Sequence, residues 1–228
     1  MHHTSLGPSI PITEEFVKQE LASLGPDASH DWWHIHRVRK LAIALARQEE
    51  LQDASIHLVE VAALLHDVQD WKYSRSESAS RAAVKEFLES QQVNEPQKTQ
   101  ILDIIAGVGF KDELGRPGSQ HISPELACVQ DADRLDAIGA IGIARCFTYG
   151  GYFKRVLHDP DIAPRTRLDK QQYTDKSFQQ TTINHFHEKL LKLKGMMKTE
   201  AGKRMAQHRH LVMEQFLQDF YSEWDANA

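Results

Sequence analysis

Apolar residues recur every three or four positions along most of the 228-residue sequence, and segments of strictly alternating polarity are nearly absent. This spacing is typical of amphipathic helices, because half-buried strands require a period of two. The sequence therefore predicts an all-α helical bundle. The expected helices span residues 13–24, 31–50, 53–68, 76–92, 95–108, 125–147, 181–197 and 199–224.

Two polar stretches interrupt this pattern, at residues 107–124 and 154–177. We expect both to be long loops, and ordered loops of this length are often functional. Residues 1–12 are expected to form a flexible N-terminus. The remaining residues, 13–224, are expected to form a single helical domain.

The composition of the chain limits the classes of protein to which it could belong. With 41% hydrophobic and 26% charged residues, the chain has a globular composition. Its net charge of −5 and pI of about 6.2 argue against a basic nucleic-acid surface. No run approaches the ~18 apolar residues of a membrane span, and the N-terminus lacks the pattern of a secretory signal. We expect a cytoplasmic protein without a membrane or nucleic-acid partner, either a monomer or a homodimer.

The chain has two cysteines, Cys128 and Cys146. On one continuous helix over residues 125–147 they would lie ~27 Å apart, far beyond the reach of a disulfide bond. Both are expected to be buried thiols of a protein from a reducing compartment.

Metal-capable side chains share the apolar faces of three expected helices. His34 lies on the apolar stripe of the second helix, and His66 lies on that of the third, directly before Asp67. In the later helix, Asp133 shares a face with apolar residues, although periodicity alone does not choose it over Asp131. A buried carboxylate needs a cation or good hydrogen bonds.

Each of these residues alone has a structural explanation, such as a hydrogen-bonded core histidine or a carboxylate near a helix end. Together they are compatible with one divalent metal. Imidazole and carboxylate ligands suit Mn²⁺, Fe²⁺, Co²⁺, Ni²⁺ or Zn²⁺, whereas sites with oxygen ligands alone favour Mg²⁺ or Ca²⁺.

The segments "HDWWHIHRVRKLA", "LLHDV" and "DADRLDAIG" resemble the motifs of the HD-domain metal-dependent phosphohydrolases. The resemblance implies an HD-type helical bundle, with core motifs at 26–147 and additional C-terminal helices at 178–224. It also implies four metal ligands, His34, His66, Asp67 and Asp133. The match extends over about residues 26–220 and is similar to a small bacterial subgroup that includes nucleoside triphosphate pyrophosphohydrolases.

Departures from the patterns of HD enzymes with two metal ions favour a site with a single metal ion. Among the proteins that this chain resembles, the dinuclear HD phosphodiesterases and the HD-type di-iron oxygenases need further histidines between the HD pair and the last aspartate. Residues 68–132 of this chain offer only His121. The G-Y-P signature of the cyclic-dinucleotide phosphodiesterases is also missing. We expect one divalent ion, with Mn²⁺ favoured and Mg²⁺, Ni²⁺, Co²⁺, Fe²⁺ or Zn²⁺ as alternatives.

Catalytic and substrate-binding residues are sought near these motifs. Asp70 follows His66 by one helical turn and could orient or deprotonate the attacking water, and Lys72 could contact the phosphates. An acidic or basic residue at the solvent-exposed end of a helix is the alternative. The further candidates for substrate binding are His30, Arg37, Lys111, Arg145 and Lys154.

The favoured hypothesis is hydrolysis of a (d)NTP to a (d)NMP and pyrophosphate by metal-activated water. A phosphomonoesterase, nucleotidase or hydrolase of another phosphorylated metabolite is the first alternative. A non-catalytic HD domain that senses a nucleotide or a metal is the second.

Overall fold

The computed structural model describes residues 7–23, 31–68, 77–109, 113, 122–165 and 180–227, and for 77–81 the backbone alone. The predicted all-α fold is confirmed: in these residues every named element is a helix, and one isolated bridge joins Val156 to Thr181. The elements are α1 Ile10–Ser23, α2 Trp32–Gln48, α3 Asp53–Leu65, α4 Glu77–Ser90, α5 Glu95–Val108, α7 Pro124–Asp136, α8 Gly139–Tyr152, α10 Thr182–Glu188, the 3-10 helix η1 Leu190–Met196, and α11 Glu200–Trp224.

Side-chain caps define where several of these helices begin. Asp31 accepts the backbone N–H of His34 at the start of α2, as the sequence predicts. Ser123 caps α7 and Thr199 caps α11 in the same way. A capping oxygen satisfies an N–H that has no partner within the helix, which contributes about 1 kcal/mol.

The prediction of one long helix over residues 125–147 is wrong, because this part of the chain forms two helices, α7 and α8. Gly139 has a φ of 75°, which is a left-handed backbone conformation that interrupts the helix. Only glycine adopts this conformation at little cost. A Cβ on Gly142 would lie 2.2 Å from the carbonyl oxygen of Ala137, so the turn also needs a glycine there. Cys128 and Cys146 consequently lie on different helices, and the helical spacing between them does not apply; both are buried free thiols, as expected.

The expected helix over residues 181–197 is also interrupted. It divides into α10 and the tighter η1, with Lys189 between them. The last expected helix is confirmed as α11, which runs from Glu200 to Trp224.

Most of the two expected polar loops, residues 110–112, 114–121 and 166–177, lies outside the described residues. The described part of the second stretch is attached to α10. Glu188 accepts hydrogen bonds from the backbone N–H of Arg165 at 2.9 Å and from its guanidinium at 3.0 and 3.2 Å. Asn184 donates to the carbonyl of Ile162 at 2.7 Å.

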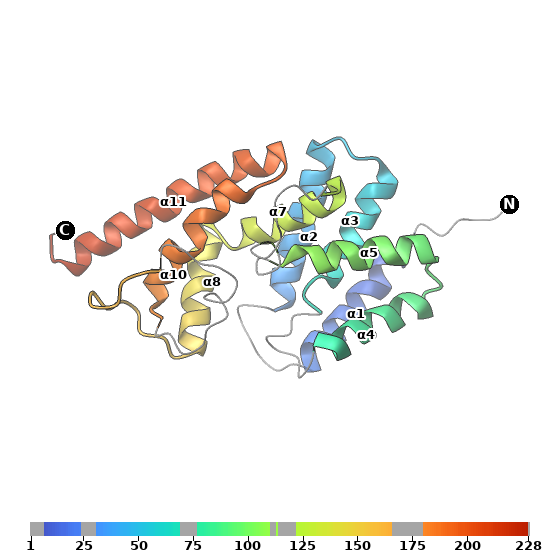
Figure 1. Ribbon diagram of the computed structural model, residues 1–228, viewed down its shortest axis with the longest axis horizontal. Coiled ribbons are helices and arrows are strands. Elements are labelled where there is room, and N and C mark those ends of the chain that lie inside the picture. The colour runs from blue at the N-terminus through green and yellow to red at the C-terminus, as the bar shows by residue number, and fades with distance from the viewer. Residues whose placement is uncertain are drawn as a thin grey trace.

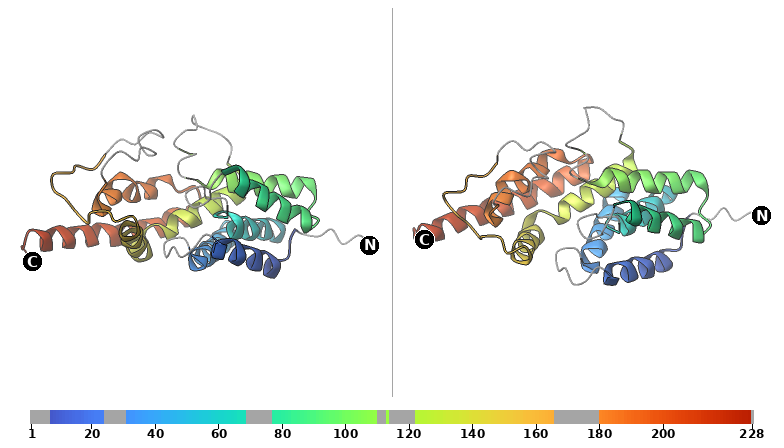
Figure 2. Two further views of the ribbon diagram at one scale, coloured as in Figure 1. Left: turned by 90° about the horizontal axis from the view of Figure 1, so that it is seen from below. Right: turned by 60° about the horizontal axis from the view of Figure 1, so that its bottom comes forward.

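Two hydrophobic clusters form the core, and α2 and α3 contribute to both. The larger cluster includes Val38 and Ala63, and the smaller one includes Ile35 and Leu64. In Figures 1 and 2, α8, α10 and α11 gather at one end of the elongated molecule and α1, α4 and α5 at the other, with α2 and α7 between them. The helices that carry the predicted ligands are therefore packed on more than one side. In the described part of the chain, no helix has the length and apolarity to cross a membrane.

Candidate metal centre

Three helix ends converge on the predicted ligands. His34 lies in the first turn of α2, and His66 and Asp67 directly follow the last residue of α3. Asp133 lies in the last turns of α7. Because α2 packs against both α3 and α7, residues that are distant in sequence meet at one place.

The ligand atoms of these residues lie close together. One atom each from His34, His66 and Asp133 fall within 4.8 Å of one another. The fourth predicted ligand also lies there, since Asp67 Oδ2 is 3.1 Å from His34 Nε2 and Asp67 Oδ1 is 3.5 Å from His66 Nε2. Asp133 Oδ1 lies 3.6 Å from His34 Nε2 and 3.9 Å from His66 Nε2.

His66 turns its Nε2 toward this cluster. Its Nδ1 lies 2.7 Å from the carbonyl oxygen of Ala63, which can only accept, so Nδ1 carries the hydrogen. In the neutral ring, Nε2 then has the lone pair, and this buried atom has no hydrogen-bond partner among the described residues. A buried nitrogen of this kind is what a metal ligand requires.

The ring of His34 is held in the same sense by Asp136. His34 Nδ1 donates to Asp136 Oδ2 at 2.8 Å, and Nε2 faces the cluster. Burial and the charge of Arg145 lower the pKa of His34, but hydrogen bonds to Asp136 and Asp67 and the charge of Asp67 raise it above its ordinary value. A cation at Nε2 therefore competes with a proton that these carboxylates stabilise.

Asp136 also binds two arginines that the sequence analysis names as substrate-binding candidates. Arg37 donates from Nε to Oδ1 at 2.7 Å and from Nη2 to Oδ2 at 3.0 Å, and Arg145 Nη1 lies 3.1 Å from Oδ2. Burial raises the pKa of Asp136, but hydrogen bonds from His34 and Arg37 outweigh this and hold the pKa well below its ordinary value. The carboxylate is therefore ionised at neutral pH.

Exposure gives the site a closed base and an open side. The side chains of His34 and His66 are each 1% exposed, whereas those of Asp67 and Asp133 are 16% and 32% exposed. A ligand would thus approach from the side on which the two carboxylates lie. Two imidazole nitrogens and two carboxylates suit a divalent transition metal, so the residues present fit the expected ion.

The other two aspartates of α7 are explained by different partners. Asp131 accepts hydrogen bonds from the backbone N–H groups of Lys198 and Thr199 and from the Thr199 hydroxyl, at 2.7–3.0 Å. It connects α7 to the start of α11. Sequence reasoning left Asp131 open as a ligand and gave Asp136 no role; the sequence shows only that another carboxylate follows Asp133 after three residues.

The structure describes only one of the remaining candidates. His30, Asp70, Lys72 and Lys111 lie outside the described residues. Lys154 is exposed in the turn after α8, and no hydrogen bond or ion pair between described residues links it to the cluster.

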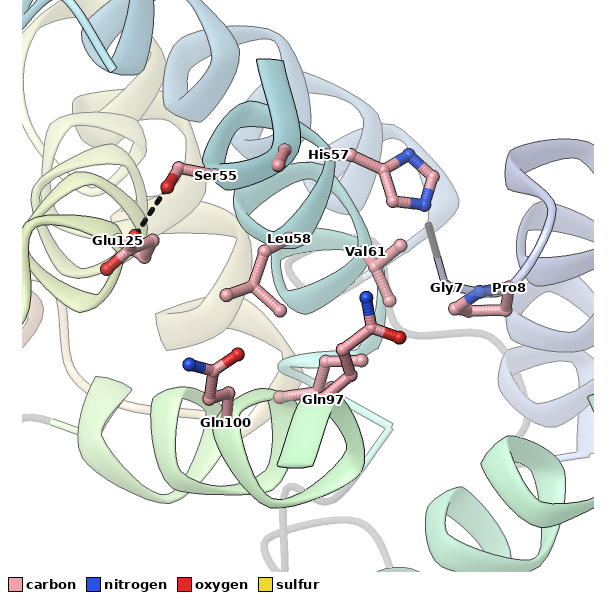
Figure 3. A pocket seen from close by; sticks show the side chains of 11 residues that line it. Gly7, Pro8, Ser55, His57, Leu58, Val61, Gln97, Gln100 and Glu125 are labelled. Carbon is pink, nitrogen blue, oxygen red and sulfur yellow. Dashed lines mark hydrogen bonds between the residues drawn. The ribbon is translucent and has the colours of Figure 1, made fainter. Parts of the chain in front are cut away.

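A separate pocket lies at the opposite end of α3 from His66 (Figure 3). Its volume is about 150 Å³, and Ser55 in its wall donates to Glu125 at 2.7 Å. None of the four cluster residues lines it. The pocket is therefore distinct from the candidate metal centre.

Comparisons with known proteins agree with this geometry. Residues 32–138 match the HD domain family. YpgQ of Bacillus subtilis is 35% identical over 205 residues, which cover 89% of each chain. Its crystal structure in complex with ADP matches with a TM-score of 0.71 and 29% identity, covering 94% of this chain and 97% of that chain.

Two further solved structures are similar over nearly the whole chain. A protein of Lactobacillus plantarum has a TM-score of 0.83 and 37% identity, covering 95% of this chain and 97% of that chain. An HD-superfamily hydrolase of Bacillus thuringiensis has a TM-score of 0.71 and 43% identity, with the same coverage. The resemblance found in the motifs is confirmed, and this chain belongs to the HD-domain family.

Proposed function

We propose that the protein is a metal-dependent nucleotide phosphohydrolase that converts a (d)NTP to a (d)NMP and pyrophosphate. The observation that carries the proposal is the convergence of His34, His66, Asp67 and Asp133, with both imidazoles oriented by acceptors at Nδ1. The nucleotide is supported by the ADP bound in the crystal structure of YpgQ.

The four side chains would hold one divalent ion, with Mn²⁺ favoured. When bound at such a site, a divalent cation lowers the pKa of a coordinated water and withdraws charge from a phosphoryl group. The two buried histidines fix the base of the site, and Asp67 and Asp133 lie on the side from which substrate approaches.

Arg37 and Arg145 would neutralise the phosphate charge. Their side chains are 33% and 14% exposed, whereas Asp136, which holds both, is 2% exposed. The guanidinium groups are thus the outward part of this buried ion cluster. Planar guanidinium groups suit phosphate oxygens because several N–H groups point in fixed directions.

The reaction is a hydrolysis. A water oxygen attacks the α-phosphorus, the bond from that phosphorus to the bridging oxygen breaks, and pyrophosphate leaves. Asp70 remains our candidate for orienting or deprotonating the water, and Lys72 for contacting the leaving phosphates. His30, Lys111 and Lys154 remain proposed substrate contacts.

Product analysis tests this proposal. Metal-stripped protein is supplied with Mn²⁺, Mg²⁺, Co²⁺ or Ni²⁺ and each (d)NTP, and the nucleotide and phosphate products are resolved by ion-exchange chromatography. We expect monophosphate and pyrophosphate in equal amounts. We also expect loss of turnover in His66→Ala but not in His208→Ala, whose side chain is exposed on α11.

Other products would change the assignment. If orthophosphate is the only phosphate product, or if nucleoside forms in place of (d)NMP, phosphatase or triphosphohydrolase chemistry would replace the proposal. An absence of turnover with every metal and nucleotide would contradict the proposed substrate class.

A further inference from the structure

The cluster around Asp136 joins groups of two kinds. On one side lies His34, a proposed metal ligand, and on the other lie Arg37 and Arg145, the proposed phosphate contacts. Asp136 is the last residue of α7, and its three partners come from α2 and α8. One carboxylate therefore connects three helices at the site.

Both oxygens of this carboxylate are engaged by its partners. Oδ1 accepts from Arg37 Nε at 2.7 Å, while Oδ2 lies 2.8 Å from His34 Nδ1, 3.0 Å from Arg37 Nη2 and 3.1 Å from Arg145 Nη1. Three of these four contacts are on Oδ2, so one oxygen contacts the histidine and both arginines. The three partners consequently share one buried side chain as an anchor.

The charges of the cluster are unequal. One carboxylate faces two guanidinium groups, so the three groups together carry one excess positive charge beside the imidazole. This excess lies on the arginines, the more exposed members, where an anionic ligand would balance it. For His34, by contrast, Asp136 provides an acceptor for the Nδ1–H. The Nε2 atom of His34 lies toward Asp67 and Asp133.

We propose that Asp136 is a positioning residue that acts on both halves of the active site. It holds His34 with Nε2 available to the metal, and it holds Arg37 and Arg145 for the phosphates of the substrate. Asp136 touches neither the ion nor the substrate. The inference rests on the proposed metal-dependent function, and it adds a residue that links metal binding to substrate binding.

Mn²⁺ titration of the metal-stripped protein by isothermal titration calorimetry tests the metal half without any turnover. We expect Asp136→Asn to weaken Mn²⁺ binding by ~10–100-fold, as the loss of a residue that orients a ligand does. The matched control is Asp103→Asn, which removes an exposed carboxylate from α5 and should leave the affinity unchanged. Circular dichroism of each variant verifies that it is folded.

Kinetics with the best (d)NTP tests the phosphate half. At saturating Mn²⁺, Asp136→Asn should raise KM because the arginines lose their anchor. A purely structural role would lower the amount of folded enzyme, and hence the apparent kcat, while KM stayed the same. An unchanged KM at saturating Mn²⁺ would contradict the phosphate half of the proposal.

If Asp136→Asn does not fold, the wild-type protein still provides a test. In ¹⁵N-histidine-labelled, metal-free protein at a pH where His34 is neutral, we expect the hydrogen on Nδ1, with the His34 signal assigned from its absence in His34→Gln. A hydrogen on Nε2 would overturn the proposed orientation.

These results also separate this inference from the proposed function. If the wild type binds Mn²⁺ tightly and Asp136→Asn binds it with unchanged affinity, the proposed role of Asp136 is overturned but the metal site is not. No Mn²⁺ binding in the wild type would overturn the metal site itself. Hydrolysis of another phosphorylated compound would leave the positioning role intact and change only the substrate.

Discussion

At the scale of single residues, the three buried or half-buried aspartates of α7 show how environment divides similar side chains. Asp131 accepts backbone N–H groups at the start of α11, Asp133 faces the two histidines, and Asp136 binds His34 and two arginines. Their spacing on a helix turns them in different directions. Sequence periodicity places Asp133 on an apolar face but does not choose it over Asp131, and only the partners from α2, α8 and α11 distinguish the roles of the three aspartates.

Arg145 allows a direct test of phosphate binding. We expect Arg145→Ala to raise KM for the nucleotide by about 10–100-fold, because a hydrogen bond to a charged group contributes ~1.5–3 kcal/mol. Steady-state kinetics measures this, with Arg47→Ala as the matched control, since Arg47 is exposed near the far end of α2. A lowered kcat with unchanged KM would contradict a role in substrate binding.

The two cysteines give a prediction on reactivity. Burial raises the pKa of Cys128 and of Cys146 to about 12 each. At pH 8, roughly one molecule in 10⁴ then carries the thiolate, which is the reactive form. Iodoacetamide should leave both thiols of the native protein unmodified at pH 8 and alkylate both after denaturation, as measured by intact mass. Rapid modification of the native protein would contradict this burial.

At the scale of elements, the sequence predicted the position and type of most helices but not their interruptions. Apolar periodicity continues through residues 137–139, so the break between α7 and α8 is invisible in it. The break depends on Gly139 with its φ of 75° and on the tight approach of Gly142 to the Ala137 carbonyl. It also determines the site, because it separates Asp136 on α7 from Arg145 on α8 and lets them pair.

The motifs could be located from sequence for the same reason that the helices could. Ligands at helix ends remain on the apolar stripe, so His34 and His66 stand out by periodicity. Asp136 could not be assigned, since its importance comes from partners 99 and 102 residues earlier in the chain.

The junction between α7 and α11 leads to a prediction on stability. A Cβ on Gly202 would lie 2.4 Å from Asp131 Oδ2 and 2.7 Å from Thr199 Oγ1. Gly202→Ala should therefore lower the free energy of unfolding by about 1–3 kcal/mol, as overpacking does. Denaturant titration measures the change. In the control Gly195→Ala, the new Cβ would meet no atom within 4 Å, so equal destabilisation of the two variants would contradict the packing described.

At the scale of the whole molecule, the site lies where two hydrophobic clusters share α2 and α3. Ile35 and Val38 are neighbours on α2 but belong to different clusters. The ligand-bearing helices are thus held by packing on more than one face, which fixes the positions of the ligands before the metal binds. Preorganised ligands bind more strongly because little ordering remains to be done.

A bound ion should therefore stabilise the whole fold. At a Mn²⁺ concentration 100-fold above Kd, the expected stabilisation is ~2.7 kcal/mol, which corresponds to a rise in Tm of about 5–10 °C for a chain of this size. Thermal unfolding with and without Mn²⁺ measures the shift, and EDTA should reverse it. A Tm that does not respond to Mn²⁺ in the wild type would contradict the preformed site.

The central claim is that His34, His66, Asp67 and Asp133 hold one divalent ion. Its most direct test is equilibrium dialysis of metal-stripped protein against Mn²⁺, followed by measurement of bound metal by mass spectrometry. The wild type and the His208→Ala control should each bind one ion per chain, and His66→Ala should bind none at the same free Mn²⁺ concentration. Equal Mn²⁺ content in His66→Ala and the wild type would contradict the assignment.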